Sequence, residues 1–261
     1  MNLWTLGPAG TFSHEAAVNL FPTAKIHFAQ NFESLFDAAE KSGNTGLIPI
    51  ENSLHGAVDE VLDLLLRSEV KIWKTYDVAV RHAFGAKNPK KVKRIASHHQ
   101  ALSQCRDFLR KHYPHVELFP VSSTSYAIEL ALEDETVGAI AMKKTMLERK
   151  LPVINEDIQR DHNTTRFGLL ARKNPFPKEK KEHMSVALIP TEDRAGLLHD
   201  LLTPFKIYDV NLSRIESRPT GEKFGSYCFF LDFAGTKESA RIQKLFEEIG
   251  KVATIKILGE W

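Results

Sequence analysis

Short apolar runs alternate with helical patterns over the first two thirds of the chain. The runs predict strands at 2–6, 45–50, 94–97, 116–120 and 137–141. Segments with apolar residues three and four positions apart follow them and predict helices at 14–21, 57–67, 98–112, 125–134 and 143–150. Ser13 is expected to cap the first of these helices. Strands that alternate with helices across short connections predict an α/β fold with a largely parallel sheet.

A stretch at 70–86 breaks this alternation, because it is consistently strand-like and too long for one strand of an α/β unit. We expect it to cross between two lobes. The first domain is therefore predicted to be two-lobed, with a cleft between the lobes.

The clearest domain boundary in the sequence lies at 172–183. This segment has two prolines, dense charge and no apolar period, as a linker does. The pattern after it predicts strand, helix, strand, strand, helix and strand, at 185–190, 196–208, 210–217, 225–233, 237–250 and 252–258. This βαββαβ order is the ferredoxin-like arrangement. The apolar alternation in the strand at 225–233 also predicts packing beyond the two helices. We expect a domain at 1–173, a linker at 174–183 and a domain at 184–261.

Composition narrows the function classes. The chain has 261 residues, of which 43% are hydrophobic, and its 35 basic and 33 acidic residues nearly balance. Nucleic-acid binding needs a basic patch or stripe and is not expected. No apolar run approaches membrane-spanning length and no secretory signal begins the chain. Cys105 and Cys228 are predicted to be buried thiols in a reducing compartment, which favours the cytoplasm.

Small polar residues gather where predicted strands meet predicted helices. In open α/β sheets ligands bind at such turns, where helix N-termini present free amides. Helix capping accounts for the serines and threonines one by one, but not so easily for Asn52 and Gln100. We therefore predict a ligand site, and its candidate residues are Glu51, Asn52, Ser53, Ser97, Gln100, Ser122, Ser123 and Thr124.

A second polar group leads into the apolar run that begins at Phe167. The residues Asn163, Thr164, Thr165 and Arg166 offer an amide, two hydroxyls and a guanidinium. Such a group could hold a small anion, or it could cap the start of a strand and leave the arginine in solvent. These residues alone leave both interpretations open.

Five motifs carry a family resemblance that decides between them. They are "GPAGTFSHEAA" (7–17), "IPIENSLHGAVDEVLDLL" (48–65), "SHHQALSQC" (97–105), "VSSTSYA" (121–127) and "NTTRFGLLAR" (163–172). In this order they resemble the prephenate dehydratases. The resemblance implies conversion of prephenate to phenylpyruvate, carbon dioxide and water in phenylalanine biosynthesis. It also implies a two-lobed, periplasmic-binding-protein-like domain. No chorismate mutase segment precedes Gly7, so a monofunctional enzyme is expected.

The resemblance also implies roles for the polar residues. Thr165 matches the family's essential threonine and is expected to donate a hydrogen bond to the leaving hydroxyl. The planar fork of Arg166 suits a carboxylate of the substrate. Thr164 and Phe167 join the expected substrate-binding residues named above. Loss of carbon dioxide and hydroxide creates an aromatic ring, so we expect no metal and no cofactor.

The C-terminal part resembles the ACT domain of these enzymes through "DRAGLLHDLLTPF" (193–205) and "IESRP" (215–219). This implies phenylalanine as an allosteric effector and pairing of domains into a homodimer or homotetramer. The expected effector residues are Arg194, Ala195, Gly196, Leu197, Glu216, Ser217, Arg218 and Pro219. Leu197 stands where the family has alanine, and the larger side chain predicts weaker or differently selective binding of phenylalanine.

Two alternatives remain. The substrate could be arogenate, which carries an amino group in place of the keto oxygen of prephenate. The chain could instead be a non-catalytic amino acid sensor, because two-lobed folds also occur in solute-binding proteins. The intact "TTRF" at 164–167 argues against a sensor.

Overall fold

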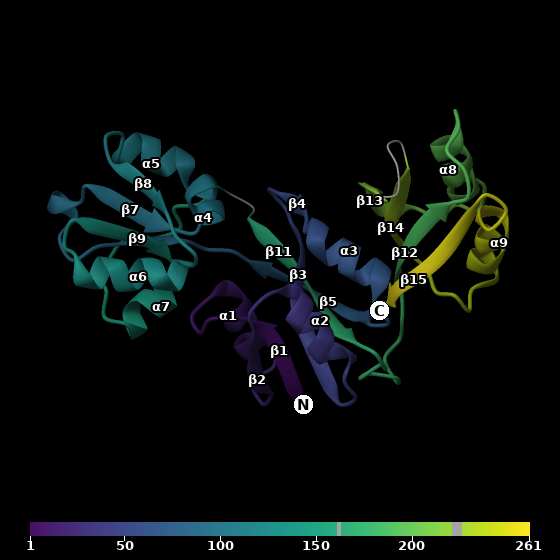
Figure 1. The fold of residues 1–261 in the computed structure, drawn as a ribbon, viewed down its shortest axis with the longest axis horizontal. Coiled ribbons are helices and arrows are strands. Elements are labelled where there is room, and N and C mark those ends of the chain that lie inside the picture. Colours follow the sequence, from purple (N-terminus) through teal and green to yellow (C-terminus); the bar gives the residue numbers. More distant parts are fainter. Residues whose placement is uncertain (161–162, 221–225) are drawn as a thin grey trace.

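Three bodies lie in a row in the computed structural model, which describes residues 1–160, 163–220 and 226–261. Figure 1 shows lobe 2 (strands and helices within 83–155) at the left, lobe 1 (those within 2–79 and the strand at 164–171) in the middle and the C-terminal module (those within 183–260) at the right. Among the described residues, no helix is long and apolar enough to cross a membrane. Cys105 and Cys228 are both buried and free, which confirms their interpretation as isolated thiols.

Lobe 1 holds the N-terminus and the last strand before the C-terminal module. Its sheet contains β1 (Asn2–Leu6), β2 (Lys25–Ala29), β3 (Asn44–Asn52), the short β4 (Gly56–Ala57), β5 (Lys71–Ala79) and β11 (Thr164–Ala171). Its helices are α1 (Phe12–Leu20), α2 (Phe32–Glu40) and α3 (Asp59–Arg67). β1 pairs in parallel with β2 and β3, whereas β11 runs antiparallel to both β3 and β5.

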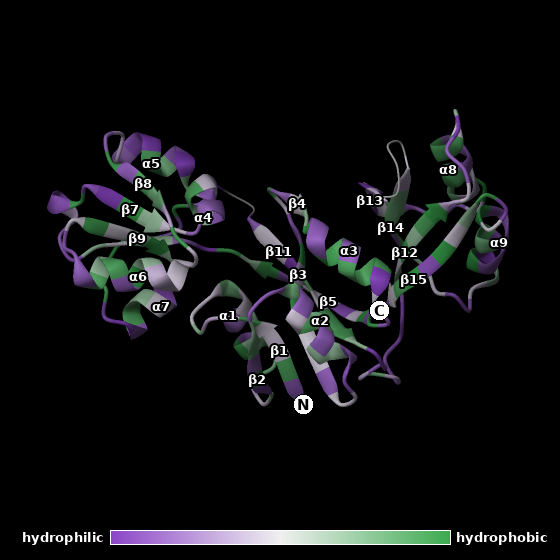
Figure 2. Cartoon of the chain, in the orientation of Figure 1, coloured by the Kyte–Doolittle hydropathy of each residue, from purple (hydrophilic) through white to green (hydrophobic). Residues whose placement is uncertain are grey.

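Lobe 2 is inserted between β5 and β11. Its sheet has the order β10–β6–β9–β7–β8, with β6 (Ala83–Gly85), β7 (Arg94–Ser97), β8 (Glu117–Pro120), β9 (Val137–Ala141) and β10 (Val153–Asn155). Its helices are the 3₁₀ turn Pro89–Lys91, α4 (His99–Gln104), α5 (Arg106–His112), α6 (Thr124–Glu133) and α7 (Lys143–Glu148). Figure 2 shows α5, on the outside of this lobe, as mostly hydrophilic and β9, inside it, as hydrophobic.

The chain passes between the two lobes twice. The first crossing leads from β5 to β6, as the stretch at 70–86 predicts, and the second leads from β10 back to β11. The crossings bind each other, since the Val80 amide donates to the Asn163 carbonyl at 2.8 Å and the Ile158 amide donates to the His82 carbonyl at 3.1 Å. The hinge therefore consists of two crossings joined by backbone hydrogen bonds between their described residues.

The C-terminal module has the predicted βαββαβ order. It comprises β12 (His183–Pro190), α8 (Leu197–Ile207), β13 (Leu212–Pro219), β14 (Tyr227–Ala234), α9 (Ala240–Ile249) and β15 (Ala253–Glu260). β15 pairs in parallel with β5 at Gly259 and Ile72, so the module and lobe 1 share one sheet. Gly259 is required there, because a Cβ would lie 2.4 Å from the Ile72 carbonyl oxygen.

β14 is buried on both faces, which confirms the packing expected beyond the two helices. Phe229 and Phe233 belong to the apolar cluster that α8 and α9 cover. Cys228 and Phe230 belong to a second cluster, which contains Ile48 and Ile72 of lobe 1 and the apolar face of α3. The module therefore shares a hydrophobic core with lobe 1.

The structure differs from the expectations in several places. The sheets are mixed, because the strands at the two crossings run against their neighbours. The helix expected at 98–112 is two helices that meet at Cys105. Thr11, and not Ser13, caps α1, because its extended backbone lets its hydroxyl accept from the His14 amide. The elements β2, α2, β4 and β10 were not expected, and residue 225 of the expected strand at 225–233 lies outside the described residues.

Candidate active site

A cavity of about 490 Å³ lies between the two lobes. Lobe 1 contributes residues from the start of α1, from β3 and from β11, and lobe 2 contributes residues from α4 and from the start of α6. The polar side chains that line it are Thr11, Ser13, Asn52, His82, His98, Gln100, Gln104, Ser122, Ser123, Thr124 and Thr165. No lysine or arginine occurs among the described residues that line this cavity.

Three helices begin at the cavity. Their capping positions are Thr11 for α1, His98 for α4 and Ser123 for α6, and all three line the cavity. The N-terminal end of a helix has free amides and carries roughly half a positive charge. The cavity can therefore hold a small anion through helix ends and neutral donors, without a charged partner.

Thr165 presents its hydroxyl to this cavity. Its Oγ1 lies 3.0 Å from Asn52 Nδ2, which donates to it. Because Asn52 occupies a lone pair of Oγ1, the hydroxyl hydrogen of Thr165 is free to donate to a bound molecule. This is the arrangement that stabilisation of a departing oxygen requires.

Asn52 belongs to a buried polar network that connects the lobes. Asn52 Nδ2 donates to Asn163 Oδ1 at 3.0 Å, and Gln104 Nε2 lies 3.5 Å from the same oxygen. Gln104 Oε1 lies 2.7 Å from His82 Nε2. Burial lowers the pKa of His82 to about 4, so its imidazole is neutral at physiological pH. Asn52, Asn163, Gln104 and His82 are all buried.

Arg166 lies on the other side of the strand. Neighbouring residues of a strand face opposite ways, and Thr165 and Phe167 line the cavity whereas Arg166 does not. Its Nε and Nη2 donate to the two carboxylate oxygens of Asp77 at 2.7 and 3.0 Å, and Nη1 is 3.6 Å from Glu51 Oε2. The hydrogen bond from Arg166 holds the pKa of the Asp77 carboxyl below its usual range.

The structure brings part of the expected site together. The expected residues that line the cavity are Asn52, Gln100, Ser122, Ser123, Thr124, Thr165 and Phe167. Those outside its lining are Glu51, Ser53, Ser97, Thr164 and Arg166. Ser97 Oγ donates to the Ile140 carbonyl at 2.6 Å, and Ser53 Oγ accepts from the Thr164 amide at 2.9 Å. These last two hydroxyls bind backbone groups that neighbouring strands bring to them.

Sequence reasoning left out five polar residues that line the cavity, namely Thr11, Ser13, His82, His98 and Gln104. Gln104 lies four positions after Gln100, so both face the same side of one helix. That spacing was a usable signal. His82 lies inside an extended crossing, and only the structure shows that its ring is buried beside Gln104.

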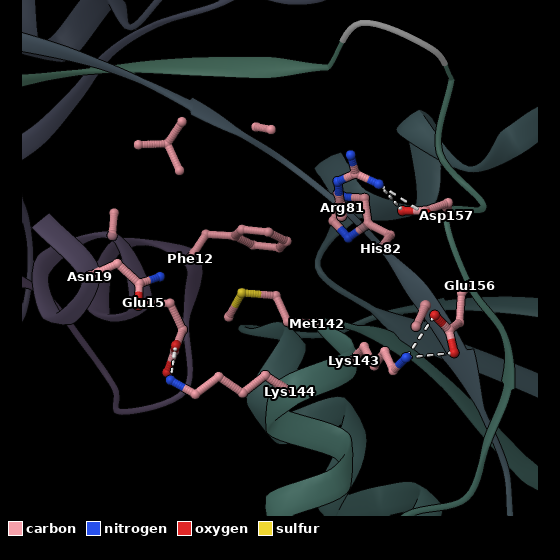
Figure 3. Close-up of a pocket in the computed structure, with 14 residues that line it drawn as sticks. Phe12, Glu15, Asn19, Arg81, His82, Met142, Lys143, Lys144, Glu156 and Asp157 are labelled. Atoms are coloured by element: carbon pink, nitrogen blue, oxygen red, sulfur yellow. Dashed lines mark hydrogen bonds and ion pairs between the residues drawn. The ribbon is translucent and has the colours of Figure 1, made fainter.

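A second cavity, of about 350 Å³, lies on the other side of the hinge (Figure 3). Phe12 and His82 line both cavities. Figure 3 shows three ion pairs around the second one, Lys143–Glu156, Lys144–Glu15 and Arg81–Asp157. Of these three ion pairs, Lys144–Glu15 alone connects lobe 2 to lobe 1, with an Nζ–Oε2 distance of 2.6 Å.

Further bonds join the lobes beside this ion pair. Ser125 Oγ donates to the Ala9 carbonyl at 3.2 Å and Thr145 Oγ1 donates to the Gly10 carbonyl at 3.2 Å. Gly10 has φ +81°, and a Cβ there would lie 2.8 Å from Thr145 Cγ2. The loop before α1 therefore lies directly against lobe 2.

The expected effector residues lie on two parts of the C-terminal module. Arg194 and Ala195 precede α8, Gly196 is its capping residue with φ +81°, and Leu197 is its first residue and is buried in the module core. Glu216, Ser217, Arg218 and Pro219 end the edge strand β13. Arg218 binds Asp59 at 2.6 Å and Asp63 at 2.8 Å, so this strand is tied to α3 of lobe 1.

Comparison with known proteins agrees with this geometry. The prephenate dehydratase family model matches residues 3–175, and the ACT domain model matches residues 190–251. The chain is 33% identical over 269 residues to the prephenate dehydratase of Methanocaldococcus jannaschii, covering 99% of this chain and 97% of that protein. It is 34% identical over 262 residues to the bifunctional chorismate mutase/prephenate dehydratase of Aquifex aeolicus, covering 98% of this chain and 72% of that protein.

A solved structure is similar over the whole chain. The prephenate dehydratase of Arthrobacter aurescens in complex with L-Phe superposes with a TM-score of 0.86 at 30% identity, covering 100% of this chain and 89% of that one. The two-lobed fold, the ordered motifs and these matches lead to one assignment. The chain belongs to the prephenate dehydratase family and carries a C-terminal ACT domain.

Proposed function

We propose that this protein converts prephenate to phenylpyruvate in phenylalanine biosynthesis. The observation that carries the proposal is the cavity between the lobes. Three helix N-termini and neutral donors surround it, and the Thr165 hydroxyl hydrogen is free to point into it. Prephenate is a small dianion with a hydroxyl to lose, and helix ends bind anions.

The reaction needs orientation and one hydrogen-bond donor at the right oxygen. The bond between the ring and its carboxylate breaks, carbon dioxide leaves, and the electron pair enters the ring. The carbon–oxygen bond on the opposite side of the ring breaks, and the departing hydroxide takes up one proton from solvent to become water. Thr165 donates to that oxygen as negative charge develops on it. The lobes hold the substrate so that both bonds are aligned.

The test is an absorbance assay for phenylpyruvate, run on the purified chain with prephenate. A parallel assay with arogenate follows the formation of phenylalanine. We expect turnover of prephenate. Turnover of arogenate alone would replace the proposed substrate, and no turnover of either would leave the amino acid sensor as the better interpretation.

The ACT domain supports a regulatory role, with phenylalanine as the proposed effector. Calorimetric titration with phenylalanine, tyrosine and tryptophan tests it, and we expect phenylalanine binding that is weakened or altered in selectivity by Leu197. An inserted side chain in a fitted pocket costs ~1–3 kcal/mol, or one to two decades of affinity. Tight phenylalanine binding that Leu197→Ala leaves unchanged or worsens would contradict this expectation.

Assembly, domain limits and location complete the proposal. We place the enzyme in the cytoplasm as a homodimer or homotetramer, with effector pockets formed between protomers by the ends of β13 and α8. Its working boundaries are 1–173, 174–183 and 184–261. Light scattering coupled to size exclusion tests the assembly, and a monomeric mass at micromolar concentration would contradict it.

A further inference from the structure

A backbone amide determines which atoms donate and which accept hydrogen bonds in the buried network. The Leu54 amide donates to Asn52 Oδ1 at 3.0 Å, and Asn52 Nδ2 lies 3.2 Å from the Thr164 carbonyl oxygen. A backbone amide can only donate and a carbonyl can only accept. The side-chain amide of Asn52 therefore has one allowed orientation, with its nitrogen toward Thr165.

The orientation of Asn52 determines the donor and acceptor atoms of the next side chains in turn. Asn52 Nδ2 donates to Asn163, so the atom of Asn163 that faces it is Oδ1. The same oxygen is near Gln104 Nε2, so Gln104 Oε1 must face His82. An amide oxygen only accepts, and His82 Nε2 must therefore carry the hydrogen. His82 Nδ1 is left with a lone pair.

We infer that His82 is a positioning residue for the dehydration, because it holds in place the last member of the chain of buried amides that reaches the Thr165 hydroxyl. The inference rests on the role proposed for Thr165. If His82 lost its donor, the amide of Gln104 could rotate, and its nitrogen would no longer have to face Asn163. Asn163 would then hold Asn52 less firmly. The Leu54 amide and the Thr164 carbonyl would still keep the nitrogen of Asn52 toward Thr165, so the expected change is a shift of Nδ2 relative to Thr165 Oγ1.

Two buried atoms of the network distinguish it from an ordinary apolar core. His82 Nδ1 and Asn163 Nδ2 have no hydrogen-bond partner among the described residues. Native cores leave few polar atoms unpaired, and each such atom calls for an explanation. The four side chains also come from different parts of the molecule, since Asn52 belongs to lobe 1, Gln104 to lobe 2, and His82 and Asn163 to the two crossings. The network is complete only when the lobes are closed on each other.

Steady-state kinetics of two substitutions test the inference. His82→Met keeps a side chain of similar length and removes the donor, whereas His82→Gln places an amide N–H near the position of Nε2. We expect kcat with prephenate to fall ~10–100-fold in His82→Met with KM unchanged, because displaced catalytic groups cost that much. His82→Gln should recover most of the loss. His115→Met, at an exposed histidine, is the matched control and should equal the wild type.

A spectroscopic measurement tests the tautomer of His82 on which the inference depends. In the ¹⁵N spectrum of the labelled full chain, the signal missing from His82→Gln belongs to His82. We expect a neutral ring protonated at Nε2 from pH 5 to pH 8, in agreement with its lowered pKa. A ring protonated at Nδ1 would overturn the inference.

The kinetic outcomes separate this inference from the proposed function. Wild-type turnover with an equal kcat in His82→Met overturns the inference alone, and so does a change confined to KM. If urea unfolding shows that His82→Met is not folded, the comparison of His82→Gln with the wild type decides. A folded His82→Gln enzyme with near wild-type kcat and an Nε2-protonated wild-type ring supports the inference, and a large loss there overturns it. Absence of turnover in the wild type overturns the proposed function and this inference with it.

Discussion

The two junctions of lobe 1 are built in opposite ways. Toward lobe 2 it meets a cavity, two crossings, a buried amide network and the ion pair between Lys144 and Glu15. Toward the C-terminal domain it continues its own sheet and shares an apolar core around Phe230. Polar contacts can be exchanged for water, whereas a shared apolar core cannot open without exposing its surface. The first junction is suited to opening and closing around a substrate, and the second is suited to holding two bodies as one.

The largest expected effect lies at the apolar junction. Phe230 is fully buried in the core shared by lobe 1 and the C-terminal domain. Phe230→Ala should lower the free energy of unfolding by about 3–5 kcal/mol, through lost burial and the cavity left behind. Urea denaturation measures the change. Phe119→Ala, at a residue that is 38% exposed, is the control and should cost far less. Equal losses in the two variants would contradict the shared core.

At the cleft, the largest expected effect is on rate. Thr165→Ala removes a donor made for the transition state and should reduce kcat by ~10²–10³. Its unfolding free energy should change little, because Thr165 lies at the wall of a cavity. Stopped assays with prephenate and urea denaturation measure the two quantities. Near-normal turnover by a folded variant would remove Thr165 from the proposed mechanism.

Lowering the pH should reduce the free energy of unfolding, because His82 is buried as a neutral ring. Its pKa is about 4 in the folded chain against an ordinary value of 6.5, because burial disfavours the charged ring. Between these values the unfolded chain binds a proton that the folded chain does not, so stability falls as pH drops from about 6.5 to about 4. The fall attributable to His82 is about 3 kcal/mol. Urea midpoints of the wild type and His82→Gln from pH 7 to pH 4.5 measure it, and parallel pH dependences would contradict it.

Arg166 lies outside the lining of the cavity, although its neighbours Thr165 and Phe167 belong to it. The planar fork of Arg166 binds both oxygens of Asp77 and a lysine cannot reproduce it. The contacts favour a bracing role, so Arg166→Lys should lower stability by about 1 kcal/mol or less and leave KM nearly unchanged. Substrate saturation curves and urea denaturation measure both. A clearly raised KM would instead support the carboxylate clamp predicted from the sequence.

The smallest effect is expected at the ion pair between the lobes. Lys144 is half exposed, so its bond to Glu15 contributes ~0.2–1 kcal/mol to closure. Lys144→Met should raise KM for prephenate by up to about fivefold. Lys143→Met is the matched control, because its partner Glu156 does not belong to lobe 1. If both variants had the same KM, the ion pair would have no part in closure.

The fold was predictable where local periodicity carries it. The crossing at 70–86 and the βαββαβ order of the C-terminal domain are confirmed, because strand and helix periods differ clearly in those stretches. α2 carried a readable signal too, since Asn31 and Ser34 form a capping box before an apolar face. The register between strands could not be predicted, and therefore neither could the mixed sheets.

The candidate site was predictable at the level of segments more than of side chains. The turns around Asn52, Gln100 and Ser122 do meet at one cavity, because strand ends and helix starts share an edge. Which way each side chain faces depends on pairing. Thr165 and Arg166 are neighbours, so one strand must send them to opposite faces. His82 and Gln104 are 22 residues apart in the chain and meet only in the folded structure, and no local pattern records that contact.

The close approach of Gly259 to Ile72 joins β15 of the C-terminal domain to β5 of lobe 1. β5 begins at that contact and runs for nine residues, about 30 Å, to the crossing that carries His82. One end of β5 pairs with β15 of the C-terminal domain, and its other end leads into the crossing between the lobes. A single strand therefore connects the sheet of the C-terminal domain to the crossing between the lobes.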